Sequence, residues 1–238
     1  MFDFFRRNQP TPKQIAKAVK KLTEPAGEEG PRVEAAERLL DWGTPEALFG
    51  LVRRFTISSK VITQDIEEKR LIVRMLVGQG DAAVAPILQF MKTHEQVDWP
   101  VRALSQIVPK EELARHLIEI IETVALSEFA VAEHRVGLIR AVHDYVTPDM
   151  EEMLAGFLDD SDDDVRIVAI EALGEVGESV RENLLQAFLD TDDRPRIRIR
   201  IAELFADRGW AVKGFRPKIE ESLPDGFGLS SKGVIRRR

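Results

Sequence analysis

The chain repeats a two-helix pattern with a period of a little over thirty residues, and this period constrains the fold more than any other feature. In the clearest copy, Val165 to Gly177, apolar residues recur at helical spacing and a glycine ends the helix. The segment from Ile197 to Gly209 aligns with it without a gap, so that Glu203 falls on Glu171. Such a repeat predicts stacked helices rather than one compact core.

Four further segments fit the same frame, and a second amphipathic segment follows each copy. Equivalent positions lie 31 to 37 residues apart. The longest interval contains a polar and β-branched stretch, residues 56–63, which we expect to be a loop insertion. We therefore predict an all-α chain of about six helix pairs, with second helices over 45–55, 82–91, 111–124, 149–158 and 180–189. The equivalent positions are Arg32, Lys69, Pro100, Arg135, Arg166 and Arg198.

The best-formed copy also resembles a known repeat. Asp-Asp-Asp164-Val-Arg166, Ala-Ile-Glu-Ala-Leu-Gly174 and the closing Gly177 resemble the HEAT repeat, in particular the bacterial HEAT-like repeat associated with phycobilin lyases. The resemblance covers roughly residues 30–222 and implies a right-handed α-solenoid, an armadillo-like α–α superhelix. The third copy departs from the pattern, because Pro109-Lys-Glu replaces the usual glycine turn. Such repeats serve many unrelated roles, so the resemblance is specific for fold and not for function.

Three segments follow from this pattern. Residues 1–29 form an N-terminal segment in which 11–22 read as a basic capping helix, and Met1 to Arg7 reads either as a hydrophobic cap or as a weak membrane-surface anchor. Residues 30–222 form the solenoid. Residues 223–238 lack helical periodicity and are rich in Gly, Ser and Arg, so we expect a flexible basic C-terminal tail. Its apolar residues leave open that it docks on the solenoid or on a partner.

Charge is unevenly spread along the chain. The net charge is −7, yet residues 1–23 hold six basic and one acidic side chain, and residues 194–238 hold twelve basic and five acidic ones. The intervening body is therefore strongly acidic. Such a body disfavours nucleic acid and favours a protein partner with a basic or amphipathic segment.

The sequence contains no motif for a disulfide, a membrane span, a phosphate site, a nucleophile or a metal site. There is no cysteine, and no apolar run long enough to cross a bilayer. No phosphate loop or nucleophile elbow is present, and the four histidines do not follow a metal-ligand spacing. The acidic run from Asp159 to Asp164 fits helix capping, and its spacing does not match a calcium loop. We predict no catalytic residue, no cofactor and no metal, in a cytoplasmic bacterial protein.

One basic run offers a candidate interaction patch. Arg196 and Arg200 lie four residues apart on one helix face, and Arg198 holds the position equivalent to Arg166. In one interpretation Arg198 pairs with acidic neighbours such as Asp192 or Asp193. In the other, the basic run forms a patch for an anion or an acidic partner. The patch would comprise Arg196, Arg200, Lys213, Arg216 and Lys218.

The sequence therefore predicts a non-catalytic protein-interaction scaffold or adaptor that uses the solenoid surface. One alternative is a HEAT-like nucleic-acid-binding protein or DNA glycosylase, which the acidic body disfavours. Another is a bilin lyase-like chaperone, for which no pigment-specific feature is present. The sequence gives no basis for an oligomeric state.

Overall fold

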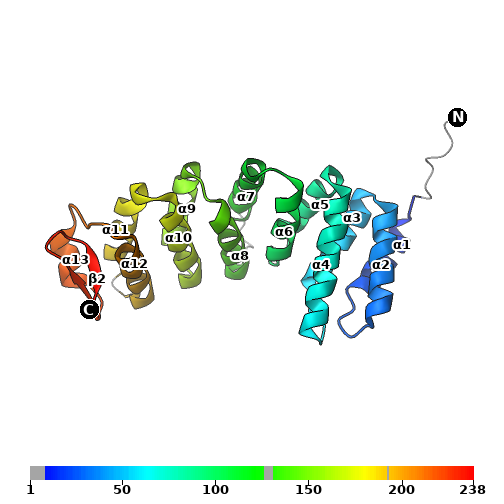
Figure 1. Cartoon of the computed structure of the whole chain (residues 1–238), viewed down its shortest axis with the longest axis horizontal. Coiled ribbons are helices and arrows are strands. Elements are labelled where there is room, and N and C mark those ends of the chain that lie inside the picture. The colour runs from blue at the N-terminus through cyan, green and yellow to red at the C-terminus, as the bar shows by residue number, and fades with distance from the viewer. Residues whose placement is uncertain (1–8, 126–130, 192) are drawn as a thin grey trace. The chain divides into compact units, whose positions relative to one another are not determined.

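The computed structural model describes residues 9–125, 131–191 and 193–238 of the 238-residue chain (Figure 1). Nearly all secondary structure in these residues is helical, and the helices alternate in antiparallel pairs. The chain forms two compact units, Met1–Val124 and Ala125–Arg238. The predicted all-α repeat fold with six helix pairs is confirmed.

The first unit begins with a single helix and continues with three pairs. Helix α1 contacts both members of the first pair, α2 and α3. First helices of successive pairs also contact one another, α2 with α4 and α4 with α6, as expected for stacked repeats. The bounds are α1 Pro12–Leu22, α2 Glu29–Trp42, α3 Pro45–Val52, α4 Ile62–Gln79, α5 Asp81–Met91, α6 Asp98–Ile107 and α7 Lys110–Ala125, with a 3₁₀ turn η1 at Arg53–Thr56.

The second unit contains three pairs and a terminal hairpin. Helix α10 lies between α8 and α12 and contacts both. Short 3₁₀ turns flank the second helices. The bounds are α8 Ala132–Val142, α9 Glu151–Gly156, α10 Asp163–Val176, α11 Arg181–Leu189, α12 Pro195–Arg208, α13 Arg216–Ser222, β1 Phe227–Leu229 and β2 Ile235–Arg237; the 3₁₀ turns are η2 His143–Tyr145, η3 Pro148–Met150, η4 Phe157–Asp159 and η5 Glu178–Val180.

Local side-chain chemistry sets many helix ends. The hydroxyl of Thr44 accepts a hydrogen bond from the Ala47 amide at the start of α3, and Asp162 caps α10 in the same way. Helices α2 and α12 end at Gly43 and Gly209, whose φ values of +57° and +68° suit a residue without a side chain. The capping role predicted for the acidic run and the glycine end predicted at Gly209 are therefore present.

Helix α4 differs from the prediction because it begins at Ile62, inside the stretch expected to be a loop. Only the segment between η1 and α4 is irregular. The additional turns of α4 carry Asp65 and Glu68, which are 7% and 5% exposed and meet buried arginines. Tertiary ion pairs thus extend a helix that the local pattern does not predict.

The segment expected to be a flexible C-terminal tail contains a β-hairpin that packs on α12, in line with the docking on the helix pairs that the sequence left open. Strands β1 and β2 pair antiparallel, with Leu229 opposite Ile235, and β2 contacts α12. Ile235 is 1% exposed, and Arg237 forms an ion pair with Asp207 on α12 at 2.7 Å. The apolar residues of this segment therefore pack against α12 and cover part of its surface.

A close approach between α1 and α3 depends on Gly50. A Cβ atom built there would lie 2.6 Å from Cγ2 of Val19, a stiff β-branched side chain. We expect Gly50→Ala to push the helices apart and to lower the free energy of unfolding by about 1–3 kcal/mol, measured by urea denaturation.

The matched control is Gly78→Ala in α4, where a Cβ atom would have no neighbour within 4 Å. Helix propensity alone should stabilise this variant by up to about 1 kcal/mol. Equal effects of the two substitutions would contradict a steric role for Gly50.

Candidate functional site

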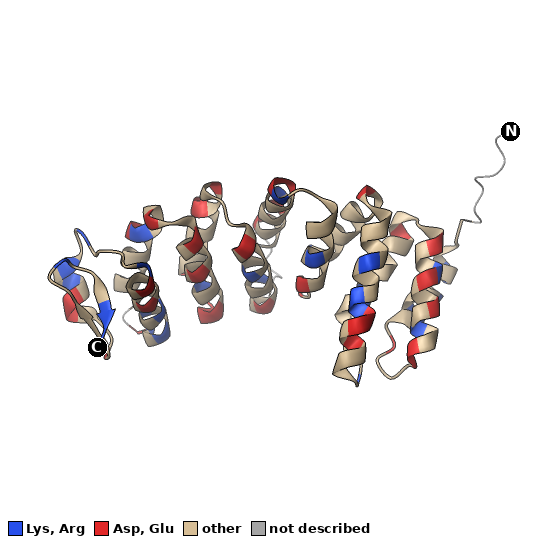
Figure 2. Cartoon of the chain, in the orientation of Figure 1, with Lys and Arg blue, Asp and Glu red and all other residues tan. Residues whose placement is uncertain are grey.

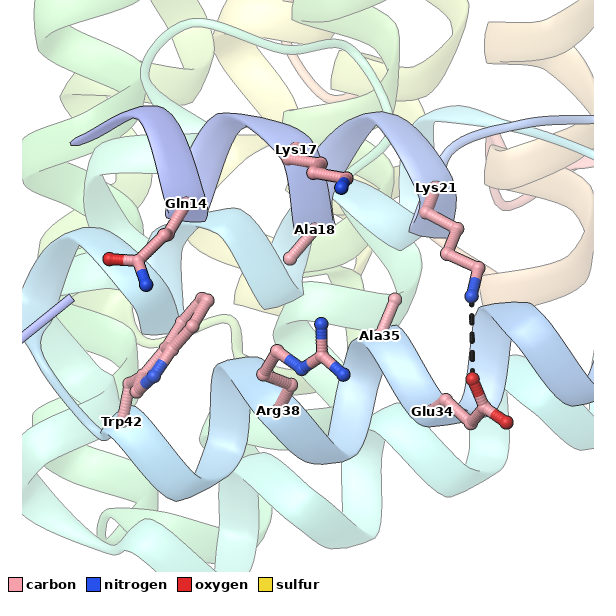
Figure 3. Close-up of a pocket in the computed structure, with 8 residues that line it drawn as sticks. All are labelled: Gln14, Lys17, Ala18, Lys21, Glu34, Ala35, Arg38 and Trp42. Atoms are coloured by element: carbon pink, nitrogen blue, oxygen red, sulfur yellow. Dashed lines mark hydrogen bonds and ion pairs between the residues drawn. The ribbon is translucent and has the colours of Figure 1, made fainter. Parts of the chain in front are cut away.

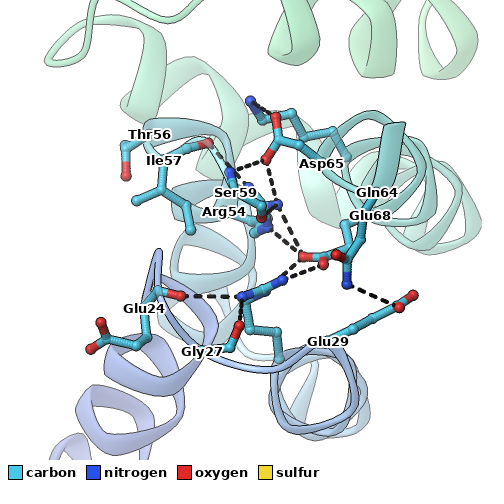
Figure 4. A network of polar contacts seen from close by, with 12 residues as sticks. Glu24, Gly27, Glu29, Arg54, Thr56, Ile57, Ser59, Gln64, Asp65 and Glu68 are labelled. Atoms are coloured by element: carbon cyan, nitrogen blue, oxygen red, sulfur yellow. Dashed lines mark hydrogen bonds and ion pairs between the residues drawn. The ribbon is translucent and has the colours of Figure 1, made fainter. Parts of the chain in front are cut away.

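Five ionisable side chains form a buried network in the first unit (Figure 4). Glu68 receives two hydrogen bonds from Arg32, at 2.6 and 2.9 Å, and one from Arg54 at 3.0 Å. Arg54 is fully buried and also donates to Asp65 at 2.7 Å. Lys69 completes the network by pairing with Asp65 at 2.7 Å.

The network holds its carboxylates ionised. Burial raises the pKa of Asp65, but hydrogen bonds from Lys69, from Arg54 and from a backbone amide lower it by more, to about 2. Burial likewise raises the pKa of Glu68, and the two arginines lower it below its usual value. The adjoining cavity is about 10 Å³, enough for one water at most. The cluster therefore has neither a proton to exchange nor room for a substrate.

Its role is to fix two loops. Arg54 donates to the Ile57 carbonyl at 3.1 Å and to the Ser59 hydroxyl at 3.1 Å, which holds the segment before α4. Arg32 donates to the carbonyls of Glu24 and Gly27, which holds the segment between α1 and α2. The network thus joins the capping helix, the first pair and the second pair.

The acidic turn before α10 is also occupied by protein partners. Arg135 of α8 pairs with Asp160 at 2.9 Å, and Asp162 caps α10. Asp163 pairs with Arg194, just before α12, at 2.5 Å, and Asp164 pairs with Arg196 of α12 at 2.7 Å. Three of the five carboxylates considered as calcium ligands, Asp160, Asp163 and Asp164, therefore bridge neighbouring repeats.

Two residues of the predicted interaction patch take part in ion pairs between neighbouring repeats. Arg196 pairs with Asp164, and Arg200 with Glu171 of α10 at 2.9 Å. Figure 2 shows acidic positions along α10 and basic positions along α12. Asp192, one predicted partner of Arg198, lies outside the described residues; Arg198 itself donates to the Phe188 carbonyl and lies over its ring.

The remaining patch positions lie in or beside α13. Arg216 donates to the Ser231 carbonyl at 3.0 Å and pairs with Glu220 at 3.5 Å. Lys213 and Lys218 are exposed and form no ion pair within the part of the chain that the structure describes. Three of the five patch residues are therefore engaged with this chain itself.

Two grooves flank α1 in the first unit. The α1–α2 groove has a volume of about 540 Å³ and is shown in Figure 3. Lys17 and Lys21 enter it from α1, and Arg38 and Trp42 enter it from α2. Its lining also includes Gln14, Ala18, Glu34 and Ala35.

The second groove lies between α1 and α3, has a volume of about 610 Å³, and is mainly apolar. Phe49 and Ile15 are half-buried at this surface, and Lys20, Glu46 and Arg53 supply charge. The other lining residues are Pro10, Pro12, Ala16, Val19, Thr23 and Gly50. We take the two grooves beside α1 as the candidate functional site.

The sequence analysis identified α1 but not these grooves. The available signals were Lys13, Lys17 and Lys21, spaced four residues apart, and a tryptophan at the end of the following helix. Met1 to Arg7, predicted either to cap the first pair or to anchor to a membrane, lies outside the described residues. Neither the lysine spacing nor the tryptophan shows which helix faces stay open after packing.

Other kinds of site find no support in the described segments. Residues 9–125, 131–191 and 193–238 contain no group of three or more potential ligands placed to hold a metal ion. Within the same ranges, each helix is either too short or too polar to span a bilayer.

Comparison with known families supports the repeat. Residues 115–206 match the family model for HEAT repeats. The match covers less than half of the chain and confirms the HEAT-repeat resemblance of the helix pairs. HEAT repeats commonly serve as protein-interaction scaffolds. Comparisons with curated proteins and with solved structures gave no match.

The buried network makes Arg54 critical for stability. We expect Arg54→Met to lower the free energy of unfolding by about 3–5 kcal/mol, because Asp65 and Glu68 lose a buried partner. Arg70→Met is the control, since the Arg70–Glu67 pair is more than half exposed and should contribute less than about 1 kcal/mol. Similar losses in urea denaturation would contradict the assignment.

The same network predicts a pH dependence. The pKa of Asp65 is lowered from 3.8 to about 2 on folding, so its stabilisation is full above pH 3.8 and lost as pH falls towards 2. The stability advantage of wild type over Asp65→Asn should shrink through this range by an amount on the order of 2 kcal/mol. Urea denaturation at a series of pH values measures it, and a constant difference would refute the prediction.

Proposed function

We propose that this protein is a non-catalytic protein-binding module that holds an amphipathic segment of a partner protein in the α1–α3 groove. The observation that supports this proposal is the open, mainly apolar groove of about 610 Å³ between α1 and α3. Residues 115–206, further along the chain, match HEAT repeats, which commonly serve as protein-interaction scaffolds. Grooves between helices are a common place for partner helices to lay an apolar face.

The groove lining favours an amphipathic occupant over a wholly apolar one. Ile15, Val19 and Phe49 supply apolar contact. Lys20 and Arg53 supply two positive charges against the single carboxylate of Glu46. A helix with an apolar face and acidic flanks would match both features.

The arrangement of the remaining charges supports placing the function here. Arg194, just before α12, and Arg196 and Arg200 within it pair with carboxylates of α10, so these charges already have partners within the second unit. The buried network of the first unit is likewise filled by its own partners. The grooves beside α1 retain space and surface for another molecule.

The test uses Ala16→Arg, which places a long charged side chain at an exposed position of the groove. Ala85→Arg, at an exposed position of α5, is the matched control because it makes the same chemical change outside both grooves. Affinity enrichment with quantitative mass spectrometry should identify a protein that wild type and Ala85→Arg retain and Ala16→Arg loses.

The purified partner should then bind Ala16→Arg at least about tenfold more weakly than Ala85→Arg by calorimetry, as expected when a central anchor site is blocked. Equal binding to both variants would reject the groove. A gel shift at low salt tests the nucleic-acid alternative, and tight duplex binding that survives added salt would favour it over the protein-binding proposal.

A further inference from the structure

We propose that the α1–α2 groove is a second binding site, which takes an acidic segment of a protein. Carboxylates of the segment would pair with Lys17, Lys21 and Arg38, and an apolar side chain would lie against Trp42. This site is separate from the α1–α3 groove and does not depend on the function proposed for that groove.

The groove has the form of a channel with charged walls and a small-residue floor. Ala18 and Ala35 are buried at the base, 6% and 3% exposed, where α1 and α2 pack together. Figure 3 shows Lys17 and Arg38 reaching into the same space from the two helices, with the Trp42 ring at one end. A volume of about 540 Å³ accommodates several side chains of a peptide.

The lining carries an excess of positive charge. Three cations, Lys17, Lys21 and Arg38, face a single carboxylate, Glu34. That carboxylate pairs with Lys21 at 3.3 Å. Lys17 and Arg38 form no ion pair within the residues that the structure describes. Two positive groups are therefore left for a ligand to neutralise.

The charge pattern of α1 continues along the groove. Lys13, Lys17 and Lys21 follow one another at intervals of four residues, so they form a stripe on one face of the helix. Consecutive members of the stripe are about 6 Å apart along the axis. An extended acidic segment carries carboxylates at comparable intervals and can contact several of these lysines at once.

A peptide fits these features better than a compact phosphate. Phosphate sites are built from backbone N–H groups converging at a helix N-terminus or a glycine-rich turn. The groups here are side chains placed along two helices from the middle to the last turn, spread along the groove rather than converging. Arg38 suits a bidentate carboxylate contact, and Trp42 adds apolar area that a bare anion cannot use.

The experiment titrates the whole protein with a fluorescein-labelled twelve-residue peptide rich in Glu and containing one Leu and one Phe, followed by anisotropy at low salt. Lys17→Gln/Arg38→Gln should bind at least about tenfold more weakly than wild type, since charge-assisted hydrogen bonds are lost. Lys213→Gln/Lys218→Gln is the matched control, because it removes the same net charge at exposed positions of the second unit. We expect its affinity to stay within about twofold of wild type.

A charge-reversal double variant distinguishes loss of the binding site from a folding defect. Lys17→Glu/Arg38→Glu should lose the acidic peptide and gain a Lys-rich peptide of the same length, which an unfolded protein would not do. Thermal melting by circular dichroism accompanies each variant. Replacing Leu and Phe of the acidic peptide by Ser should weaken its binding to wild type. The same replacement should change its binding to the Trp42→Ala variant little.

Several results would overturn the assignment. They are no binding of the acidic peptide, equal losses in the two glutamine double variants, and stronger competition by inorganic phosphate or by phosphatidylserine vesicles than by unlabelled peptide. Ala16→Arg separates this proposal from the previous one, since it should retain the acidic peptide even if it loses its partner in the α1–α3 groove.

Discussion

In each helix pair, the contact between the two helices leaves part of their apolar surface uncovered. Burial of that surface by neighbouring pairs underlies the other features of the structure. Helix α10 illustrates the constraint, because it contacts α8, α9 and α12 and buries residues around most of its circumference. A repeat that is covered by the pair before and the pair after leaves uncovered surface wherever the series stops. The elements at the two ends of the chain are consequences of that requirement.

The two ends meet the requirement differently. At the C-terminal end, the β1–β2 hairpin buries Ile235 and ties itself to α12 through Arg237 and Asp207. In the first unit, helix α1 contacts both α2 and α3, and a groove lies between α1 and each of these two helices.

Charge is distributed to match this arrangement. The acidic body and basic ends, which suggested basic partners when only the sequence was considered, meet within the second unit as ion pairs between α10 and α12. Within the first unit, Arg32, Arg54 and Lys69 neutralise Asp65 and Glu68 in the interior. Cations of α1 and α2 remain beside the α1–α2 groove, and this unequal use of charge places the proposed binding sites at α1.

The sequence by itself determined the helix pairs, most of their ends and the capping helix α1, because these depend on residues three or four positions apart and on local caps such as Thr44, Gly43 and Gly209. Only the tertiary structure decided the early start of α4, the terminal hairpin, the partners of Arg196 and Arg200, and the grooves beside α1. Arg32 meets Glu68 across 36 positions, and Arg196 meets Asp164 across 32. Such contacts depend on how one repeat is placed against the next. A periodic pattern specifies which face of a helix is apolar, but not which charged side chain of a neighbouring repeat it will meet or where packing leaves a space.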